Sequence, residues 1–231
     1  MRPSPALLGC AALATCLATG CKAQSGAGPT STADPEPAAG RGPAAPTAGP
    51  EKLEIRRGTP ITIDGRAAQG EWDDAATLTV EVAPGWTSTV RYKHDGSNLL
   101  VAFANLGSGR GTFVYPEVLL DAKNDGGLVW GPDDWWFHAS WADCWAHGSY
   151  NDYDSCRSEA KPPFEANNYV DRAQAPEWIE LQIPMATVLL TPSSAFRLAF
   201  VLTDTRREYS LWPARAQLGI PASWADARAV P

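Results

Sequence analysis

The feature that most constrains the fold is an alternation of apolar and polar residues with a period of two, repeated in short segments from residue 51 onward. The segments are rich in β-branched and aromatic residues, and Gly, Asp, Asn or Pro separates one from the next. They predict strands at 61–64, 77–83, 88–95, 98–105, 115–122, 135–140, 177–184 and 196–204. The sequence HDGSN at 94–98 indicates a tight turn between two strands. No long window has helical spacing, so we expect only short helical turns, at 71–76 and 184–190.

Eight or more short strands joined by turns predict an all-β domain, an antiparallel β-sandwich of jelly-roll-like architecture. The domain is expected to span residues 51–231, and roughly 180 residues are enough to bury a substantial core. No GxGxxG or phosphate-binding loop follows a predicted strand, and no internal repeat is present.

The first 21 residues have the pattern of an export signal. Arg2 precedes an apolar run of Ala and Leu with small residues, and the run is too short for a comfortable membrane span. The segment ends in Leu-Ala-Thr-Gly-Cys, which resembles a bacterial lipobox in which Cys21 becomes the lipidated first residue. Ala18 departs from that pattern, which prefers Leu there. An ordinary secretory signal is the alternative.

Residues 22–50 are mostly Gly, Ala, Pro, Ser and Thr. Such a segment cannot bury enough apolar surface to offset its ordering entropy, so it is predicted to be a disordered tether. A lipid, a tether and a domain together predict an exported protein anchored to the bacterial membrane, at the outer membrane or cell surface.

The net charge and the cysteine content indicate what the domain is not expected to bind and how it is held together. The chain has a formal net charge of −7, and an acidic domain is a poor candidate for binding nucleic acid. Of the five cysteines, only Cys144 and Cys156 remain in the domain. An even number in an oxidising compartment predicts a disulfide between them, with two buried thiols as the alternative.

Residues 133–150 concentrate aromatic side chains. They include four of the ten tryptophans, Trp135, Trp136, Trp141 and Trp145. Alternation along the strand predicts that Trp135 and Phe137 lie on one face and that Trp136 and His138 lie on the other. Because one face must be core, about half of these rings are structural. Trp72 and Trp178 are expected to be core residues, whereas Trp141 and Trp145 would either line a ligand site or pack on the disulfide.

Several motifs, taken in order, resemble family 9 carbohydrate-binding modules. The opening ITIDGRAAQGEWDDAATL has the family's strand, Asp-Gly turn and Glu/Asp-x-Trp, and YPEVLLDAKNDGG resembles its Val-Glu-Ile-Phe-Ile-Asp segment. DDWWFHAS, WIELQIP and FRLAFVLTD resemble later strands, and LWPARAQLG resembles a terminal Trp-x6-Gly element. The resemblance covers about 61–219. Related DOMON-like sandwiches share the architecture.

The resemblance implies a glycan ligand held by aromatic stacking and by polar groups. Trp212 matches the family's C-terminal stacking tryptophan, and Glu117 matches the acidic residue that accepts sugar hydroxyls. His138 and Ser140 match polar positions on the following strand. The second stacking position has Phe113 or Tyr115 in place of a tryptophan, and Trp141 and Trp145 are further candidates to supply that wall.

The run DAKNDGG places Asp121, Asn124 and Asp125 on one turn, with Asp133 and Asp134 close along the chain. Clustered oxygen ligands suit calcium, and the resemblance implies structural calcium, although the spacing is not that of an EF-hand. An Asx-rich turn without metal is the alternative. No other cofactor is expected.

Catalysis is not expected. GxSxG, HExxH and CxxC motifs are absent from the sequence, and the histidines lack metal-motif spacing. A glycoside hydrolase would need two facing carboxylates, for which Asp133, Asp134, Glu117 and Glu180 are available.

The second hypothesis is a surface scaffold that binds a protein partner through its Trp-rich loop. A narrow slot lined by Trp212, Glu117 and Tyr115 would favour a glycan, whereas a broad apolar patch would favour a protein.

Overall fold

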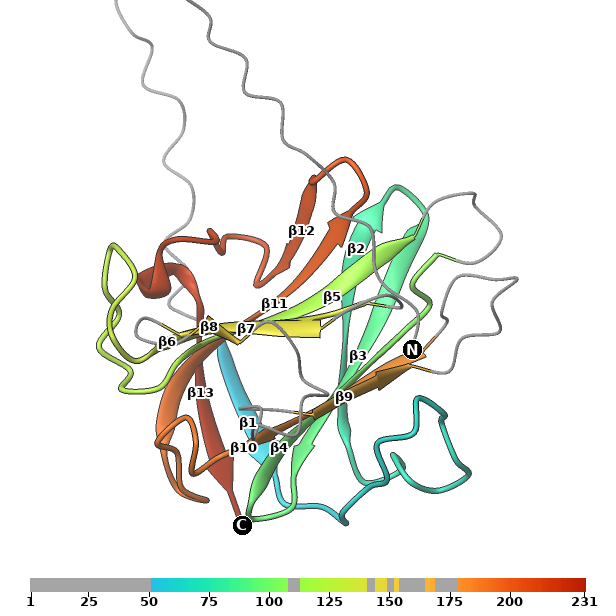
Figure 1. Cartoon of the computed structure of the whole chain (residues 1–231), viewed down its shortest axis with the longest axis horizontal. Coiled ribbons are helices and arrows are strands. Elements are labelled where there is room, and N and C mark those ends of the chain that lie inside the picture. The colour runs from blue at the N-terminus through green and yellow to red at the C-terminus, as the bar shows by residue number, and fades with distance from the viewer. Residues whose placement is uncertain (1–50, 108–112, 141–143, 149–151, 154–164, 169–177) are drawn as a thin grey trace, which may run out of the picture. The chain divides into compact units, whose positions relative to one another are not determined.

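A computed structural model describes residues 51–107, 113–140, 144–148, 152–153, 165–168 and 178–231. These lie in a compact unit that spans Pro46–Pro231. The predicted signal, tether and lipidated Cys21 fall outside the described residues. The strands and the one 3-10 turn of the described part (Figure 1) are β1 Lys52–Arg56, β2 Ala76–Ala83, β3 Trp86–His94, β4 Asn98–Ala104, β5 Val114–Asp121, β6 Asp134–Ala139, β7 Cys144–Gly148, β8 Asp152–Tyr153, β9 Glu165–Asn168, β10 Trp178–Pro184, β11 Ala195–Asp204, β12 Tyr209–Trp212, η1 Pro221–Ser223 and β13 Ala225–Val230.

The described strands form two sheets, which confirms the predicted all-β sandwich. One sheet has eight strands in the order β1-β13-β11-β5-β6-β7-β8, with β12 paired to β11. The other has five strands in the order β2-β3-β4-β10-β9. Pairing is antiparallel except between β1 and β13, which are parallel.

Seven of the predicted strands are present with boundaries shifted by no more than a few residues. The predicted turn at 94–98 joins β3 to β4, and the Asp95 carboxylate accepts hydrogen bonds from the backbone N–H groups of Ser97 and Asn98, both 2.7 Å long. The strand predicted at 61–64 is wrong, because this segment is irregular. The backbone N–H groups of Thr62 and Asp64 donate instead to the carboxylates of Glu71 and Glu180, so these two donors are paired with side chains.

The predicted helical turns at 71–76 and 184–190 are hydrogen-bonded turns that do not continue into helices. Within them, Ala75 N–H donates to the Trp72 carbonyl and Thr187 N–H donates to the Pro184 carbonyl. The one short helix of the described part is the 3-10 turn η1, which was not predicted. No helix in the described ranges is long and apolar enough to cross a membrane.

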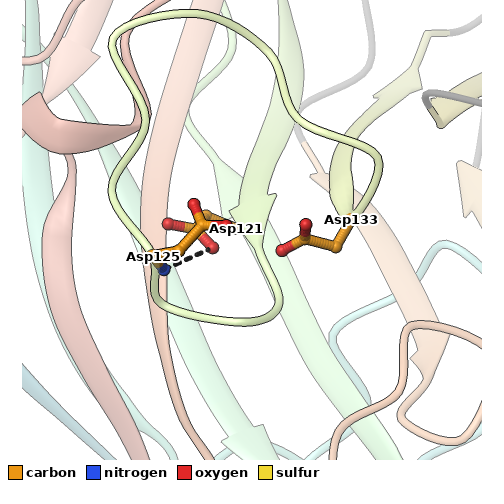
Figure 2. Close-up of side chains that lie close together, drawn as sticks. All are labelled: Asp121, Asp125 and Asp133. Atoms are coloured by element: carbon orange, nitrogen blue, oxygen red, sulfur yellow. Dashed lines mark hydrogen bonds between the residues drawn. The ribbon is translucent and has the colours of Figure 1, made fainter.

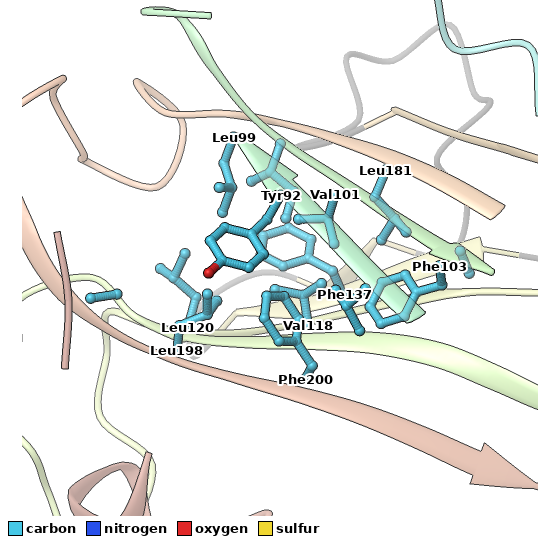
Figure 3. Packing of buried hydrophobic residues seen from close by; sticks show 14 of the residues in the cluster. Tyr92, Leu99, Val101, Phe103, Val118, Leu120, Phe137, Leu181, Leu198 and Phe200 are labelled. Carbon is cyan, nitrogen blue, oxygen red and sulfur yellow. The ribbon is translucent and has the colours of Figure 1, made fainter. Parts of the chain in front are cut away.

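The main core lies between the two sheets (Figure 3), where Val101 and Phe103 of β4 face Val118 of β5 and Phe200 of β11. Phe103 and Phe200 are fully buried and meet edge to face, with ring centroids 5.9 Å apart. The alternation in β6 is confirmed, because Phe137 lies in this core with Trp135 packed against it. Trp136 lies on the other face, in a separate cluster.

Each sheet also carries an apolar cluster on its outer face. Behind the five-stranded sheet, Trp72 packs on Leu100 and Ala102, with the half-buried Trp178 beside it. This confirms a packing role for Trp72 and Trp178. Behind the eight-stranded sheet, Leu119 and Val201 pack against Trp224, which is fully buried. The remainder of that second outer face is where the candidate site lies.

Candidate functional site

A cavity of about 410 Å³ opens on the outer face of the eight-stranded sheet. This volume is within the usual range for small-ligand sites. Neighbouring strands β5, β6, β7 and β11 supply its floor, and the hairpin between β11 and β12 forms one side. The lining residues are Tyr115, Glu117, Trp136, His138, Trp145, Thr203, Asp204, Thr205, Arg207 and Tyr209. We call this cavity the outer-face pocket.

Strand register explains why residues distant in sequence meet there. Glu117 of β5 is paired with His138 of β6, and His138 is paired with Trp145 of β7. Directly paired residues project to the same side of a sheet, so the three side chains form a row across it. Tyr115 lies two residues before Glu117 and therefore on the same face.

The floor of the pocket is a hydrogen-bonded network. His138 Nδ1 donates to Glu117 Oε1 at 2.7 Å, and Thr203 Oγ1 donates to Glu117 Oε2 at 2.8 Å. Glu117 is 3% exposed and His138 is 9% exposed. A buried carboxylate that accepts two hydrogen bonds is satisfied, and it fixes the orientation of the imidazole ring.

Aromatic rings stand beside this floor. The Trp145 indole stacks on the His138 ring, with centroids 4.7 Å apart and planes 7° from parallel. Trp136 meets Trp145 at 63°, with centroids 5.6 Å apart, so two indoles form an angled corner. Tyr115 lies on the other side of His138, with centroids 5.8 Å apart. Aromatic faces next to hydrogen-bonding groups suit a ligand that has both apolar faces and hydroxyl groups.

The β11–β12 hairpin, which forms the side of the pocket, is held by hydrogen bonds and ion pairs among its own residues. Asp204 Oδ1 accepts from the backbone N–H groups of Arg206 and Glu208, at 2.8 and 2.9 Å. Arg206 bridges the Asp204 and Glu208 carboxylates. Burial alone would raise the pKa of Asp204, but the hydrogen bonds from Glu208 and Arg206 outweigh it and hold that pKa below its usual range. Arg207, at φ 67°, takes the left-handed position that closes the hairpin.

The structure brings together four of the predicted binding residues, Tyr115, Glu117, His138 and Trp145. Ser140 is buried directly after β6, the strand that carries His138, but does not line the pocket. Phe113 packs edge-on against Tyr115 without lining the pocket itself. Trp141 lies outside the described residues. Cys144 is buried at the start of β7, and Cys156 also lies outside the described residues, so their disulfide stays a prediction.

Trp212 does not join the other predicted residues. Trp212 of β12 is the cross-strand partner of Phe200 of β11, and the two ring centroids lie 5.9 Å apart. Its side chain packs on the core between the two sheets. Glu117 and His138 are on the opposite face of the same sheet. Trp212 instead borders a separate groove with β2 residues such as Thr79 and Glu81. The slot expected between Trp212, Glu117 and Tyr115 is therefore not formed by the described residues.

Sequence reasoning missed several residues of the pocket. Thr203, Thr205, Arg207 and Tyr209 come from the β11–β12 hairpin, for which no strand was predicted beyond residue 204. Trp136 could have been found, since the period-two alternation already placed it on the same face as His138.

A second polar site lies in the loop between β5 and β6 (Figure 2). Carboxylate oxygens of Asp121, Asp125 and Asp133 lie within 4.8 Å of one another. Asp121 accepts from the backbone N–H groups of Gly126 and Asp125, at 2.9 and 3.3 Å. The Asp121 carboxylate therefore holds the start of the loop in place through hydrogen bonds to the backbone four and five residues further on.

The neighbouring carboxylates carry an electrostatic cost. Burial, with Asp121 and Asp133 nearby, raises the pKa of Asp134 to about 6, although Gly131 N–H donates to it. Burial also raises the pKa of Asp121. Asp134 Oδ1 and Asn124 Oδ1 are buried and have no hydrogen-bond partner within the described part of the chain. Two cationic side chains lie close by, because Arg197 Nε is 3.8 Å from Asp121 and Lys123 Nζ is 3.4 Å from Asp133.

Glu180, which was considered as a hydrolytic carboxylate, lies on the other sheet. It is fully buried and accepts from the indole N–H groups of Trp72 and Trp178, at 3.0 and 2.9 Å. Burial raises its pKa despite these donors. Glu180 therefore anchors the segment that covers that sheet and does not face Glu117.

The chain was compared with known protein families, curated sequences and solved structures. No family model and no curated protein sequence matches the chain. Among solved structures, it is similar to a family 9 carbohydrate-binding module from Caldicellulosiruptor kristjanssonii in complex with cellotriose (TM-score 0.54, 12% identity), covering 77% of this chain and 93% of that one. The glucose complex of a family 9 module from the same organism gives a TM-score of 0.51 at 15% identity, covering 77% and 95%. A candidate carbohydrate-binding protein from Bacteroides uniformis gives 0.52 at 12%, covering 78% and 99%. The predicted resemblance in fold is thus confirmed.

Proposed function

We propose that the domain is a carbohydrate-binding module without catalytic activity and that the outer-face pocket holds the sugar. The observation that carries this proposal is the buried Glu117–His138 pair with Trp145 stacked on the imidazole. A pyranose ring has C–H faces that pack on an indole and hydroxyl groups that need fixed polar partners. The similarity of the fold to modules solved with cellotriose and glucose supports the same conclusion.

The polar chemistry of the pocket favours binding over hydrolysis. The carboxylates among its described lining residues are Glu117 and Asp204. Glu117 is engaged by His138 and Thr203, and Asp204 by the backbone and side chain of its own hairpin. Glycoside hydrolysis uses one carboxyl group as an acid and another as a base or nucleophile. Two carboxylates committed to structural hydrogen bonds fit a fixed binding surface better.

The experiment that tests this function is a titration of intrinsic tryptophan fluorescence with mono- and oligosaccharides, including glucose and cellotriose. Because Trp136 and Trp145 line the pocket, a bound sugar would change their environment. We expect a saturable change with at least one sugar and no release of reducing ends during prolonged incubation. The absence of a response from the folded protein to every sugar would refute the function.

We further propose that the Asp121–Asp134 loop binds calcium. The buried oxygens of Asn124 and Asp134 that lack partners could complete a coordination shell begun by the three clustered aspartates. The cations Arg197 and Lys123 already balance part of the charge, so we expect a modest affinity. Calcium should raise the melting temperature and EDTA should lower it, and the Asp125→Asn variant should reduce the difference. Equal melting temperatures in calcium and EDTA would favour a metal-free turn.

The placement of the domain is also a proposal. We infer that Cys21 carries a lipid and that residues 22–50 tether the domain to a bacterial membrane, at the outer membrane or cell surface. A glycan-binding domain on a tether would hold a polysaccharide close to the cell.

A further inference from the structure

The loop between β5 and β6 exposes three consecutive apolar side chains. Leu128 is 76% exposed, Val129 is 74% exposed and Trp130 is 38% exposed. Among the described residues, the other exposed large apolar side chains are Leu189 and Tyr209, and each of these stands singly. Single exposed apolar residues are ordinary on a protein surface, whereas three in succession indicate a contact surface. We call Leu128, Val129 and Trp130 the apolar tip.

The base of the apolar tip is fixed by the rest of the domain. Ala222 N–H donates to the Gly127 carbonyl at 3.0 Å. The Trp130 ring meets the fully buried Trp224 ring edge to face, with centroids 5.5 Å apart. Trp130 also lies nearly parallel to Trp136, with centroids 6.4 Å apart, and so continues the aromatic surface of the pocket. Because the exposed side chains stand on a packed base, a contact made by them costs less entropy.

The apolar tip lies near the point where the chain enters the domain. Glu51, the first described residue, accepts at its carbonyl from Asp226 N–H at 2.9 Å. Arg197 links this point to the loop, because its Nη2 lies 3.7 Å from Asp226 Oδ1 and its Nη1 donates to the Ala222 carbonyl at 3.2 Å. Ala222 in turn donates to Gly127, next to the tip. A lipid anchor upstream of Glu51 would therefore keep this side of the domain within reach of the bilayer.

We propose that the apolar tip inserts into the surface of a lipid bilayer, so that the folded domain itself contacts the membrane. This inference goes beyond sugar binding, and its choice of a bilayer as the partner rests on the proposed lipid anchor. Leu and Val side chains gain free energy on leaving water, and Trp favours the interface between headgroups and acyl chains. The contact is weak on its own, but a tether raises the effective concentration of the bilayer at the tip.

The size of the tip favours a bilayer over a protein partner. A stable protein interface buries roughly 800 Å² on each side, which three loop side chains do not supply. A bilayer needs no complementary shape, and a few apolar side chains make a shallow contact with it.

The charges of the loop predict how this contact responds to lipid and salt. The loop carries one cation, Lys123, against Asp125 and Asp133. Lys123 Nζ lies 3.4 Å from Asp133 Oδ1, so the cation is already paired. Attraction to anionic headgroups is therefore not the driving force. We expect insertion into zwitterionic bilayers, with little dependence on salt.

The test is an equilibrium titration of the unlipidated Cys21→Ala protein with an excess of phosphatidylcholine vesicles that carry brominated acyl chains. Insertion should quench tryptophan fluorescence, to the same extent at low and high salt. Leu128→Asp in this background should weaken vesicle binding roughly tenfold or more, because a charge replaces an inserting side chain. Leu189→Asp is the matched control, since Leu189 is 72% exposed on the turn between β10 and β11, and it should bind like its parent.

Several results would overturn the inference. They are a parent protein that does not bind vesicles, a folded Leu128→Asp variant that binds like its parent, and equal losses in Leu128→Asp and Leu189→Asp. Self-association of the parent that Leu128→Asp abolishes, without vesicle binding, would assign the tip to a protein contact instead.

Sugar titrations separate this inference from the proposed function. Leu128 does not line the outer-face pocket, so Leu128→Asp should keep the sugar affinity of its parent. A protein that binds vesicles but no sugar would refute the function and leave the membrane contact standing, and the reverse result would do the opposite.

Discussion

At the scale of single residues, the site depends on how Glu117 is used. Both of its oxygens accept hydrogen bonds within the sheet, and the one shared with His138 sets the angle of the imidazole on which Trp145 stacks. In the proposed sugar site, Glu117 therefore contributes mainly through His138. This makes Glu117 a positioning residue for the stacked pair.

The Glu117→Gln variant should bind sugar more weakly than the wild type. Glutamine keeps the shape but loses the charge, and hydrogen bonds to charged groups contribute about 1.5–3 kcal/mol. We expect a loss of affinity of roughly tenfold to a hundredfold in calorimetric titration. Circular dichroism and the melting temperature should show that the variant is still folded. A folded variant with wild-type affinity would show that the network does not support the site.

The sequence located part of this site, for reasons that individual residues make clear. Alternation along one strand put His138 and Trp136 on one face, and this is local information. Trp212 could not be placed in the same way, because its face is set by pairing with Phe200 across a hairpin. Cross-strand register of this kind depends on turn geometry, which residues 205–208 do not reveal by composition.

At the scale of elements, the β5–β6 loop carries two distinct features. It carries the aspartate cluster at its base, and Trp130 extends the aromatic surface from the same loop. Asp134 is the first residue of β6, so the electrostatics of the loop act directly on the strand that holds His138.

Asp134 should make the fold less stable as the pH rises. Its pKa is raised from 3.8 to about 6, so the folded state binds this proton more tightly than the unfolded state. In EDTA, the contribution of Asp134 to the free energy of unfolding should be most favourable below about pH 4. It should decline by about 3 kcal/mol up to about pH 6 and stay constant above that.

The measurement is urea denaturation of the wild type and of Asp134→Asn across pH 4 to 7, both in EDTA. The asparagine side chain cannot ionise, yet its oxygen can still accept from Gly131. The difference between the two proteins in free energy of unfolding should therefore follow the titration of Asp134. A difference that is independent of pH would contradict the raised pKa.

The elements themselves were predicted unevenly. Central strands such as β4, β5 and β11 are short, mostly apolar runs that are buried along nearly their whole length, so the sequence predicted them within a few residues. The edge strand β1 and the C-terminal β13 were missed, because they are short and rich in charged residues or alanine. Their pairing is parallel and joins the two ends of the domain, and a local pattern cannot indicate such a contact.

At the scale of the whole molecule, two sheets enclose one core, and the outer face of the larger sheet is left to carry the site. The fold class was readable from the sequence because the alternation is strong and repeated. The position of the site was not, because the pocket is assembled from β5, β6, β7 and the β11–β12 hairpin, which are distant in sequence.

The predicted lipid anchor can be tested on the intact protein. Expressed in a bacterial host, the wild type should fractionate with membranes and incorporate labelled fatty acid. Cys21→Ala should be recovered in the soluble exported fraction and remain unlabelled, because no second lipid signal is evident in the sequence. An unlabelled wild type in the soluble exported fraction would identify residues 1–21 as an ordinary secretory signal.

The most direct test of the central claim compares two tryptophan variants by calorimetric titration with the best ligand of the wild type. Trp145→Ala removes the ring stacked on His138 in the outer-face pocket, whereas Trp212→Ala removes a ring on the opposite face of the sheet. We predict that Trp145→Ala abolishes measurable binding, and that Trp212→Ala lowers the melting temperature but keeps the affinity within about twofold of the wild type. Binding retained by Trp145→Ala and lost in a folded Trp212→Ala would place the sugar on the other face and contradict the site proposed here.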